Sequence, residues 1–105
     1  MKNKIYIFLD DEREEMYNQI SANKDFLYIH CYTYEEAINV LKLADITNIV
    51  IDFDNDLGTV KEGYDVAKYI VENQIPLLYF KIHSMNPVAR KNIYELLIHY
   101  GYKFN

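Results

Sequence analysis

Three groups of polar residues in this chain directly follow apolar runs, and together they could carry metal or phosphate chemistry. In chain order they are Asp10-Asp11-Glu12 after Ile5–Leu9, Asp54-Asn55-Asp56 after Ile49–Phe53, and His83–Pro87 after Leu77–Ile82. If the runs are neighbouring parallel strands, all three groups meet at one edge of a sheet, where open α/β sheets bind ligands. Carboxylates, a histidine, a hydroxyl and a helix start in one cleft favour phosphate or metal chemistry.

The acidic groups allow two interpretations. Asp10 and Asp11 could hold a hard cation such as Mg²⁺ through oxygen ligands, or they could favour a helix start through its dipole. Side chains alternate along a strand, so Asp52 and Asp54 should point the same way, with Asp54 nearer the cleft and Asp52 deeper. Asp56 could serve the site, or the Asn55–Gly58 segment could be a solvated turn.

The third group joins a strand end to a helix start within five residues. His83 is either the acid–base group of the cleft or a structural side chain. Asn86 suits an N-cap, and that helix start would offer N–H groups to an anion, to which Ser84 could add a hydroxyl. Arg90 lies one turn after the expected start of this helix, where a positive charge opposes the helix dipole. Either a bound anion nearby or solvation of an exposed side chain would account for this placement.

Apolar runs alternating with helical patterns predict βα units around a parallel sheet. The expected strands are Lys4–Leu9, Phe26–Cys31, Asn48–Phe53 and Leu77–Ile82, and the expected helices are Arg13–Ala22, one opened by the capping box at Thr33–Glu36, Tyr64–Glu72 and one running from Asn86 to Gly101. Tyr102–Phe104 could add a short fifth strand. We predict a single α/β three-layer, flavodoxin-like domain with sheet order 2-1-3-4, because this order places strands one and three at the switch point.

Composition narrows the classes of function. The chain has 105 residues, a formal charge of −5 and 50% hydrophobic residues, which predicts one folded domain and argues against a face for duplex DNA. The lone Cys31 cannot form an internal disulfide, and we expect it to be a buried structural thiol. The five-residue apolar run near the N-terminus is too short for a signal peptide or membrane span. We therefore expect a cytoplasmic protein; the sequence leaves its oligomeric state open.

Four segments together resemble the cyclic-phosphate processing receiver domain family, a divergent group of response-regulator receiver domains. They are Leu9–Arg13, the Asp-x-Asp-Leu-Gly block at 54–58, Gly63–Ala67 and His83–Pro87. The resemblance runs from the first expected strand to the last expected helix. It implies a receiver-like fold and a role in processing cyclic phosphates.

The resemblance also implies roles for individual residues. Asp10 and Asp11 match the metal-binding acids of receivers, and Asp54 matches their acceptor aspartate. Ser84 falls near the Ser/Thr that contacts a phosphoryl group, and His83 matches the histidine of the family. The chain departs from the family at Asn55, where histidine is common, and no clear lysine ends a fifth strand, since Lys103 is only a weak match.

Three hypotheses follow. The chain could be a metal-dependent phosphoesterase for a cyclic phosphate on an RNA end or nucleotide, with Mg²⁺ on Asp10, Asp11 and Asp54 and with His83 moving a proton. It could instead be a non-catalytic module that binds a protein partner or a small phosphorylated ligand, which the asparagine at position 55 favours. The third hypothesis is a phosphoreceiver modified at Asp54.

Overall fold

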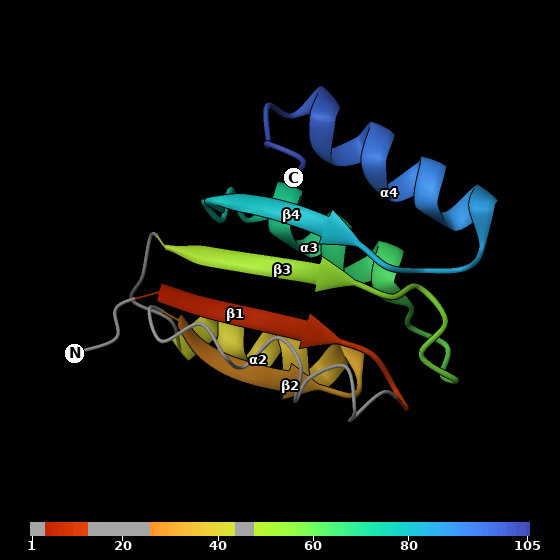
Figure 1. Cartoon of the computed structure of the whole chain (residues 1–105), viewed down its shortest axis with the longest axis horizontal. Coiled ribbons are helices and arrows are strands. Elements are labelled where there is room, and N and C mark those ends of the chain that lie inside the picture. Colours follow the sequence, from red (N-terminus) through yellow and green to blue (C-terminus); the bar gives the residue numbers. More distant parts are fainter. Residues whose placement is uncertain (1–3, 13–25, 44–47) are drawn as a thin grey trace.

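The computed structural model describes residues 4–12, 26–43 and 48–105 and places four parallel strands in one sheet (Figure 1). The strands are β1 (Lys4–Leu9), β2 (Phe26–Cys31), β3 (Ile49–Phe53) and β4 (Tyr79–Ile82). Their order across the sheet is β2-β1-β3-β4, which confirms the predicted order 2-1-3-4. The first expected helix, Arg13–Ala22, lies outside the described residues.

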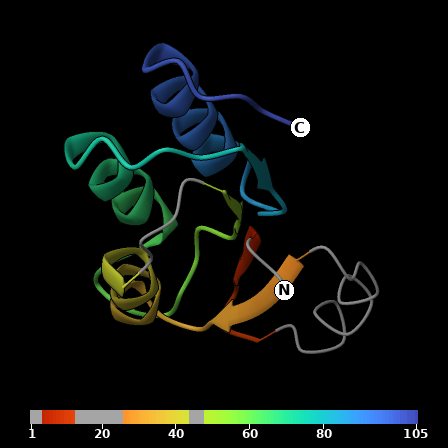
Figure 2. The same cartoon turned by 90° about the vertical axis from the view of Figure 1, so that its left-hand side faces the viewer.

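The described residues form three helices, α2 (Tyr34–Leu43), α3 (Gly63–Glu72) and α4 (Pro87–His99). Figure 2 shows α2 and α3 together on one side of the sheet, with α4 beside α3. Because side chains alternate along a strand, every second side chain of β1 and β3 faces these helices. The main core joins these side chains to the buried faces of α3 and α4, as with Ile7, Ile51, Ile70 and Ile93, all fully buried.

The opposite face of the sheet carries a second, largely aromatic cluster. Its buried members are Tyr6, Phe8, Phe26 and Val50. The same alternation places Asp52 on this face, two residues after Val50 on β3. A polar residue deep in a strand therefore lies among aromatic rings rather than in the main core.

Local signals in the sequence set the helix ends. Thr33 Oγ1 accepts from the Glu36 N–H before α2, and Glu62 and Asp65 form a capping box at α3. Asn86 caps α4 with Pro87 in its first turn, and Gly101 follows that helix with φ +89°, the left-handed conformation that favours glycine. The predicted start and end of α4 are confirmed.

Several boundaries differ from the sequence prediction. β3 begins at Ile49 instead of Asn48, and α3 begins at Gly63 instead of Tyr64. β4 begins at Tyr79 instead of Leu77. The segment expected as a fifth strand, Tyr102–Phe104, is reduced to one parallel bridge between Phe80 and Phe104. Phe80 N–H donates to the Lys103 carbonyl at 2.8 Å, and Asn105 N–H donates to the Phe80 carbonyl at 2.9 Å, so β4 is paired on this side only locally. Within the described part of the chain, no helix is long and apolar enough to cross a membrane.

Candidate functional site

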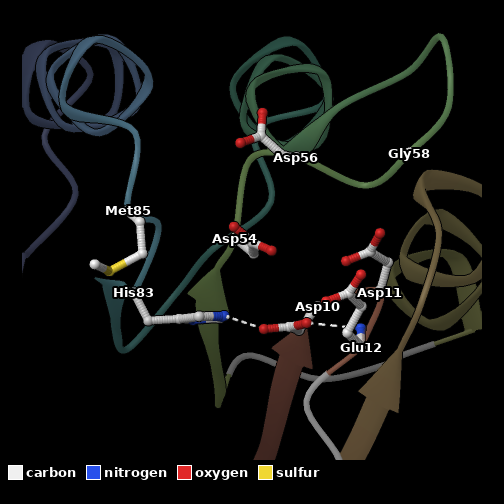
Figure 3. Close-up of a pocket in the computed structure, with 8 residues that line it drawn as sticks. All are labelled: Asp10, Asp11, Glu12, Asp54, Asp56, Gly58, His83 and Met85. Carbon is white, nitrogen blue, oxygen red and sulfur yellow. Dashed lines mark hydrogen bonds and ion pairs between the residues drawn. The ribbon is translucent and has the colours of Figure 1, made fainter.

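The sheet register brings Asp10, Asp54 and His83 side by side. Phe8, Asp52 and Lys81 are paired across β1, β3 and β4, and the three site residues each follow two positions later. The N–H of Asp54 donates to Leu9 O and that of His83 donates to Phe53 O, both at 2.9 Å, so pairing continues to the strand ends. With a side-chain period of two, all three residues share one face of the sheet, as Figure 3 shows.

His83 lies between two carboxylates that come from different strands. Its Nδ1 lies 2.7 Å from Asp52 Oδ1, and its Nε2 lies 3.0 Å from Asp10 Oδ2. Ionised carboxylates only accept hydrogen bonds, so the arrangement suits a ring that carries a hydrogen on both nitrogens. Burial of the ring opposes protonation, but the hydrogen bonds and charges of Asp52 and Asp10 outweigh it and raise the pKa of His83.

Asp10 and Asp54 form an acidic pair next to the histidine. Asp10 is only 3% exposed, and its Oδ1 accepts the Glu12 N–H at 2.8 Å. Burial and the nearby charge of Asp10 raise the pKa of Asp54, although His83 acts in the opposite direction. One ligand atom from each of Asp10, Asp54 and His83 lies within 4.8 Å of the others. Two crowded carboxylates at this spacing would be stabilised by a cation between them.

These residues open into a hollow of about 310 Å³ at the carboxyl ends of the strands. Its lining residues are Asp10, Asp11, Glu12, Asp54, Asp56, Gly58, His83 and Met85. In Figure 3, the carboxylates of Asp10 and Asp54 lie near the His83 ring, with those of Asp11 and Asp56 farther out. Among the residues that the structure describes, the lining holds five acids and no lysine or arginine, so the potential of this part attracts cations and repels a bare phosphate.

The residues expected to hold an anion do not line this hollow. Ser84 is 2% exposed, and its Oγ accepts the Asn86 N–H at 3.2 Å. Asn86 Oδ1 accepts from Val88 and Ala89, so the amides at the start of α4 already have a partner. Arg90 donates to the carbonyl oxygens of Ile82 and Ser84 at 3.1 and 3.4 Å. These contacts close the turn from β4 into α4 and hold His83 in place.

Asn55 and Asp56 point to different places. Asn55 Oδ1 accepts the Tyr64 N–H at 3.0 Å, so this side chain serves the start of α3, and Asn55 is not among the lining residues. Asp56 is exposed and lines the hollow, with its Oδ1 3.3 Å from Asn55 Nδ2. In this turn, Asn55 therefore stabilises the start of α3, and Asp56 contributes to the lining of the hollow.

Sequence reasoning did not assign a role to Asp52, Tyr6 or Phe8. Asp52 accepts from the Tyr6 hydroxyl at 3.0 Å while it holds His83, and Phe8 stacks on the His83 ring with centroids 4.6 Å apart and planes 7° apart. The alternation along β1 and β3 could have indicated this, because Tyr6, Phe8 and Asp52 share the face of Asp10 and Asp54. Pairing with His83 depends on β4, because His83 follows that strand and lies 31 residues beyond Asp52.

Comparison with known proteins agrees with this fold. The structure matches the crystal structure of the signal receiver domain of a protein assigned as a Luxo repressor from Vibrio parahaemolyticus, with a TM-score of 0.74 and 20% identity over 99% of this chain and 76% of that chain. At this identity the match shows the receiver fold alone. A comparison with curated proteins finds no match. The family model described as the cyclic-phosphate processing receiver domain matches residues 5–99. The chain therefore belongs to the cyclic-phosphate processing receiver domain family.

Proposed function

We propose that this domain binds a divalent cation in the acidic hollow and hydrolyses a cyclic phosphodiester there, such as the 2′,3′-cyclic phosphate of an RNA end or a nucleotide. The observation that carries the proposal is the row of Asp10, Asp54 and His83 at the strand ends, with ligand atoms within 4.8 Å. It combines cation ligands and a proton donor in one hollow. The family match to cyclic-phosphate processing receivers supports the substrate class.

The lining of the hollow suits a hard cation. Asp10, Asp11 and Asp54 offer the oxygen ligands that Mg²⁺ prefers. Burial and the charge of Asp10 raise the pKa of Asp54, and a cation bound between the two carboxylates would offset this effect. A bound Mg²⁺ would neutralise phosphate charge, which matters in a hollow whose own charge repels anions.

His83 is the proposed proton donor. In hydrolysis of a cyclic phosphodiester, the oxygen of water forms a bond to phosphorus and one proton of that water passes to solvent. One ring P–O bond breaks, and the released sugar oxygen takes up a proton from the acid. Burial of His83 opposes protonation, but Asp52 and Asp10 favour the charged ring and raise the pKa of His83. The protonated ring can therefore act as the general acid that donates this proton. Its Nε2 edge faces Asp10, at the lining of the hollow.

The direct test is turnover of 2′,3′-cyclic nucleotides and of RNA with a 2′,3′-cyclic end, with and without Mg²⁺. We expect a phosphomonoester product that requires the cation, and a loss of about 10²-fold or more in His83→Gln, the range that removal of an acid–base group produces. His99→Gln is the matched control, because His99 is exposed on α4 and absent from the lining of the hollow. If neither substrate turns over with Mg²⁺, or His83→Gln keeps full activity, the catalytic proposal is wrong.

A second candidate function is cation-dependent binding of a phosphorylated ligand without turnover. It is favoured by Asn55, which stands where the family commonly has histidine and bonds to the start of α3 at 3.0 Å. In the described part of the chain, His83 is then the one histidine that lines the hollow. Thermal unfolding with Mg²⁺ and a cyclic nucleotide separates the two functions: stabilisation without product supports binding alone. Beryllofluoride with Mg²⁺ serves as a comparison, because it should stabilise the protein if Asp54 accepts a phosphoryl group.

A further inference from the structure

Asp52 is a buried acid that the proposed chemistry uses only for the effect of its charge on His83. It is 7% exposed and lies outside the lining of the hollow. A carboxylate taken out of water is costly unless charged or polar groups pair with it. Replacing a buried ion pair by well-packed apolar residues often leaves the stability of a protein unchanged or raises it. Stability alone therefore gives little reason for an acid at this position.

Both oxygens of Asp52 are engaged, each by a different strand. Oδ1 lies 2.7 Å from His83 Nδ1 beyond the end of β4, and Oδ2 accepts the Tyr6 hydroxyl from β1 at 3.0 Å. Tyr6 is 5% exposed, and its ring packs edge-on against Phe26 at 5.8 Å. The hydroxyl is therefore itself held in place, and it fixes the rotation of the Asp52 carboxylate.

The His83 ring is constrained on its face as well as on its edge. Phe8 stacks on it at 4.6 Å and 7°, which sets the ring plane, and Asp52 holds Nδ1, which sets the rotation within that plane. The remaining nitrogen, Nε2, then faces Asp10 and the hollow. Without Asp52, a flip of the ring about χ2 would exchange the nitrogen and carbon atoms that face the hollow.

We propose that Asp52, fixed by the hydroxyl of Tyr6, is a positioning residue that holds the His83 ring with Nε2 directed into the hollow. Asp52 acts through His83 and contacts no substrate. This role resembles that of the acid that orients the histidine in hydrolase triads, where geometry rather than chain order defines the role. The inference rests on the proposed function only in treating His83 as the acid–base group.

The orientation can be measured without any substrate, from the imidazole ¹H and ¹⁵N resonances of His83 at about pH 6. We expect a protected Nδ1–H proton in the wild type. In Asp52→Asn a neutral acceptor replaces a charged one, so that proton should move upfield and exchange with water about tenfold faster. In Tyr6→Phe the proton should remain and exchange faster than in the wild type, because the carboxylate loses its second anchor.

Two further variants complete the experiment. Asp52→Ala should abolish the protected Nδ1–H signal if the protein folds, and Asp52→Asn should retain part of it. Tyr79→Phe is the matched control, since it removes a hydroxyl from the same sheet face and leaves Tyr6 intact. If Asp52→Asn and Tyr6→Phe both fold and leave the Nδ1–H resonance and its exchange as in the wild type, the positioning role is overturned.

Turnover supplies a separate readout. Asp52→Ala should lower kcat about 10²-fold with little change in KM, because a misplacement of about 1 Å costs that much, and Asp52→Asn should recover part of the loss. If KM changes as much as kcat in Asp52→Ala and Asp52→Asn, the positioning role is contradicted. If the wild type turns over no cyclic phosphate, the proposed function fails, while the resonance measurements still decide whether Asp52 orients His83.

Discussion

The α-carbon of Gly63 packs directly against the main chain of Asp54, so that a side chain at position 63 would overlap the Asp54 carbonyl oxygen. The same side chain would lie 2.9 Å from Asn55 Cα, and the Gly63 N–H donates to the Asn55 carbonyl at 2.9 Å. The first residue of α3 therefore supports the backbone that carries a central acid of the site. Glycine is required here for close approach.

We predict that Gly63→Ala destabilises the protein by about 1–3 kcal/mol, the usual cost of overpacking, and displaces Asp54. Urea unfolding measures the stability, and stabilisation by Mg²⁺ reports on the site. Gly101→Ala is the control: it strains a left-handed residue with no atom within 4 Å of the added carbon, so it should cost about 1–2 kcal/mol and leave the Mg²⁺ response unchanged. A Gly63→Ala protein with wild-type stability and Mg²⁺ response would contradict the prediction.

Asp54→Asn should make the cation-free protein more stable and raise its melting temperature. Burial and the charge of Asp10 raise the pKa of Asp54, so its ionised form at neutral pH is a cost to the folded state. Excess Mg²⁺ should stabilise the wild type and have little effect on the variant. The melting temperature measures both effects, with exposed Glu95→Gln as a control for simple charge loss. An unchanged Mg²⁺ response in Asp54→Asn would rule out this ligand.

Stability should fall as the pH rises past the ordinary histidine range. The pKa of His83 is raised above 6.5 in the folded state, since Asp52 and Asp10 outweigh the effect of burial. A raised folded-state pKa means that the stabilising contribution is complete below about pH 6.5 and is lost as the pH passes through the folded-state value. Urea midpoints between about pH 6 and pH 8 should therefore decrease in the wild type. The decrease should be absent from His83→Gln; a parallel decrease in both proteins would point to another group.

Cys31 should resist alkylation in the native protein. It is 1% exposed, and burial, with a smaller effect from Glu36, raises its pKa from 9.0 to about 12. Little reactive thiolate forms at about pH 8, and reagent access is blocked. We expect iodoacetamide to label Cys31 in urea and to leave the native protein unmodified. The same shift predicts a stability contribution that is complete below about pH 9 and lost between pH 9 and pH 12. Equal labelling rates in native and unfolded protein would show that the thiol is accessible.

Several features of the site follow from short-range patterns. Asn86 and Pro87 start α4, Gly101 ends it, and polar groups follow the strands β1, β3 and β4. Parallel strands joined through helices must present their carboxyl ends at one edge, so the meeting of Asp10, Asp54 and His83 could be predicted. These features depend on neighbours in the chain or on a simple rule of topology.

The direction of individual side chains could not be predicted in this way. Arg90 and Ser84 were candidates for holding an anion, but in the structure Arg90 binds two carbonyl oxygens and Ser84 is buried in the turn before α4. Asn55 reaches the start of α3 instead of the lining of the hollow. The partners of these polar groups depend on how α3 and α4 pack against the sheet, which short-range patterns do not specify.

Hydrophobic periodicity and capping act over a few residues, so the α/β pattern, the start and end of α4 and the residues at the carboxyl edge follow from the amino-acid sequence. The contacts by which Asp52 holds His83 and Tyr6 holds Asp52 arise only when the strands are assembled. Those contacts join residues 31 and 46 positions apart, and they depend on the register of three strands. A shift of one residue in that register would turn the same side chains to the other face of the sheet.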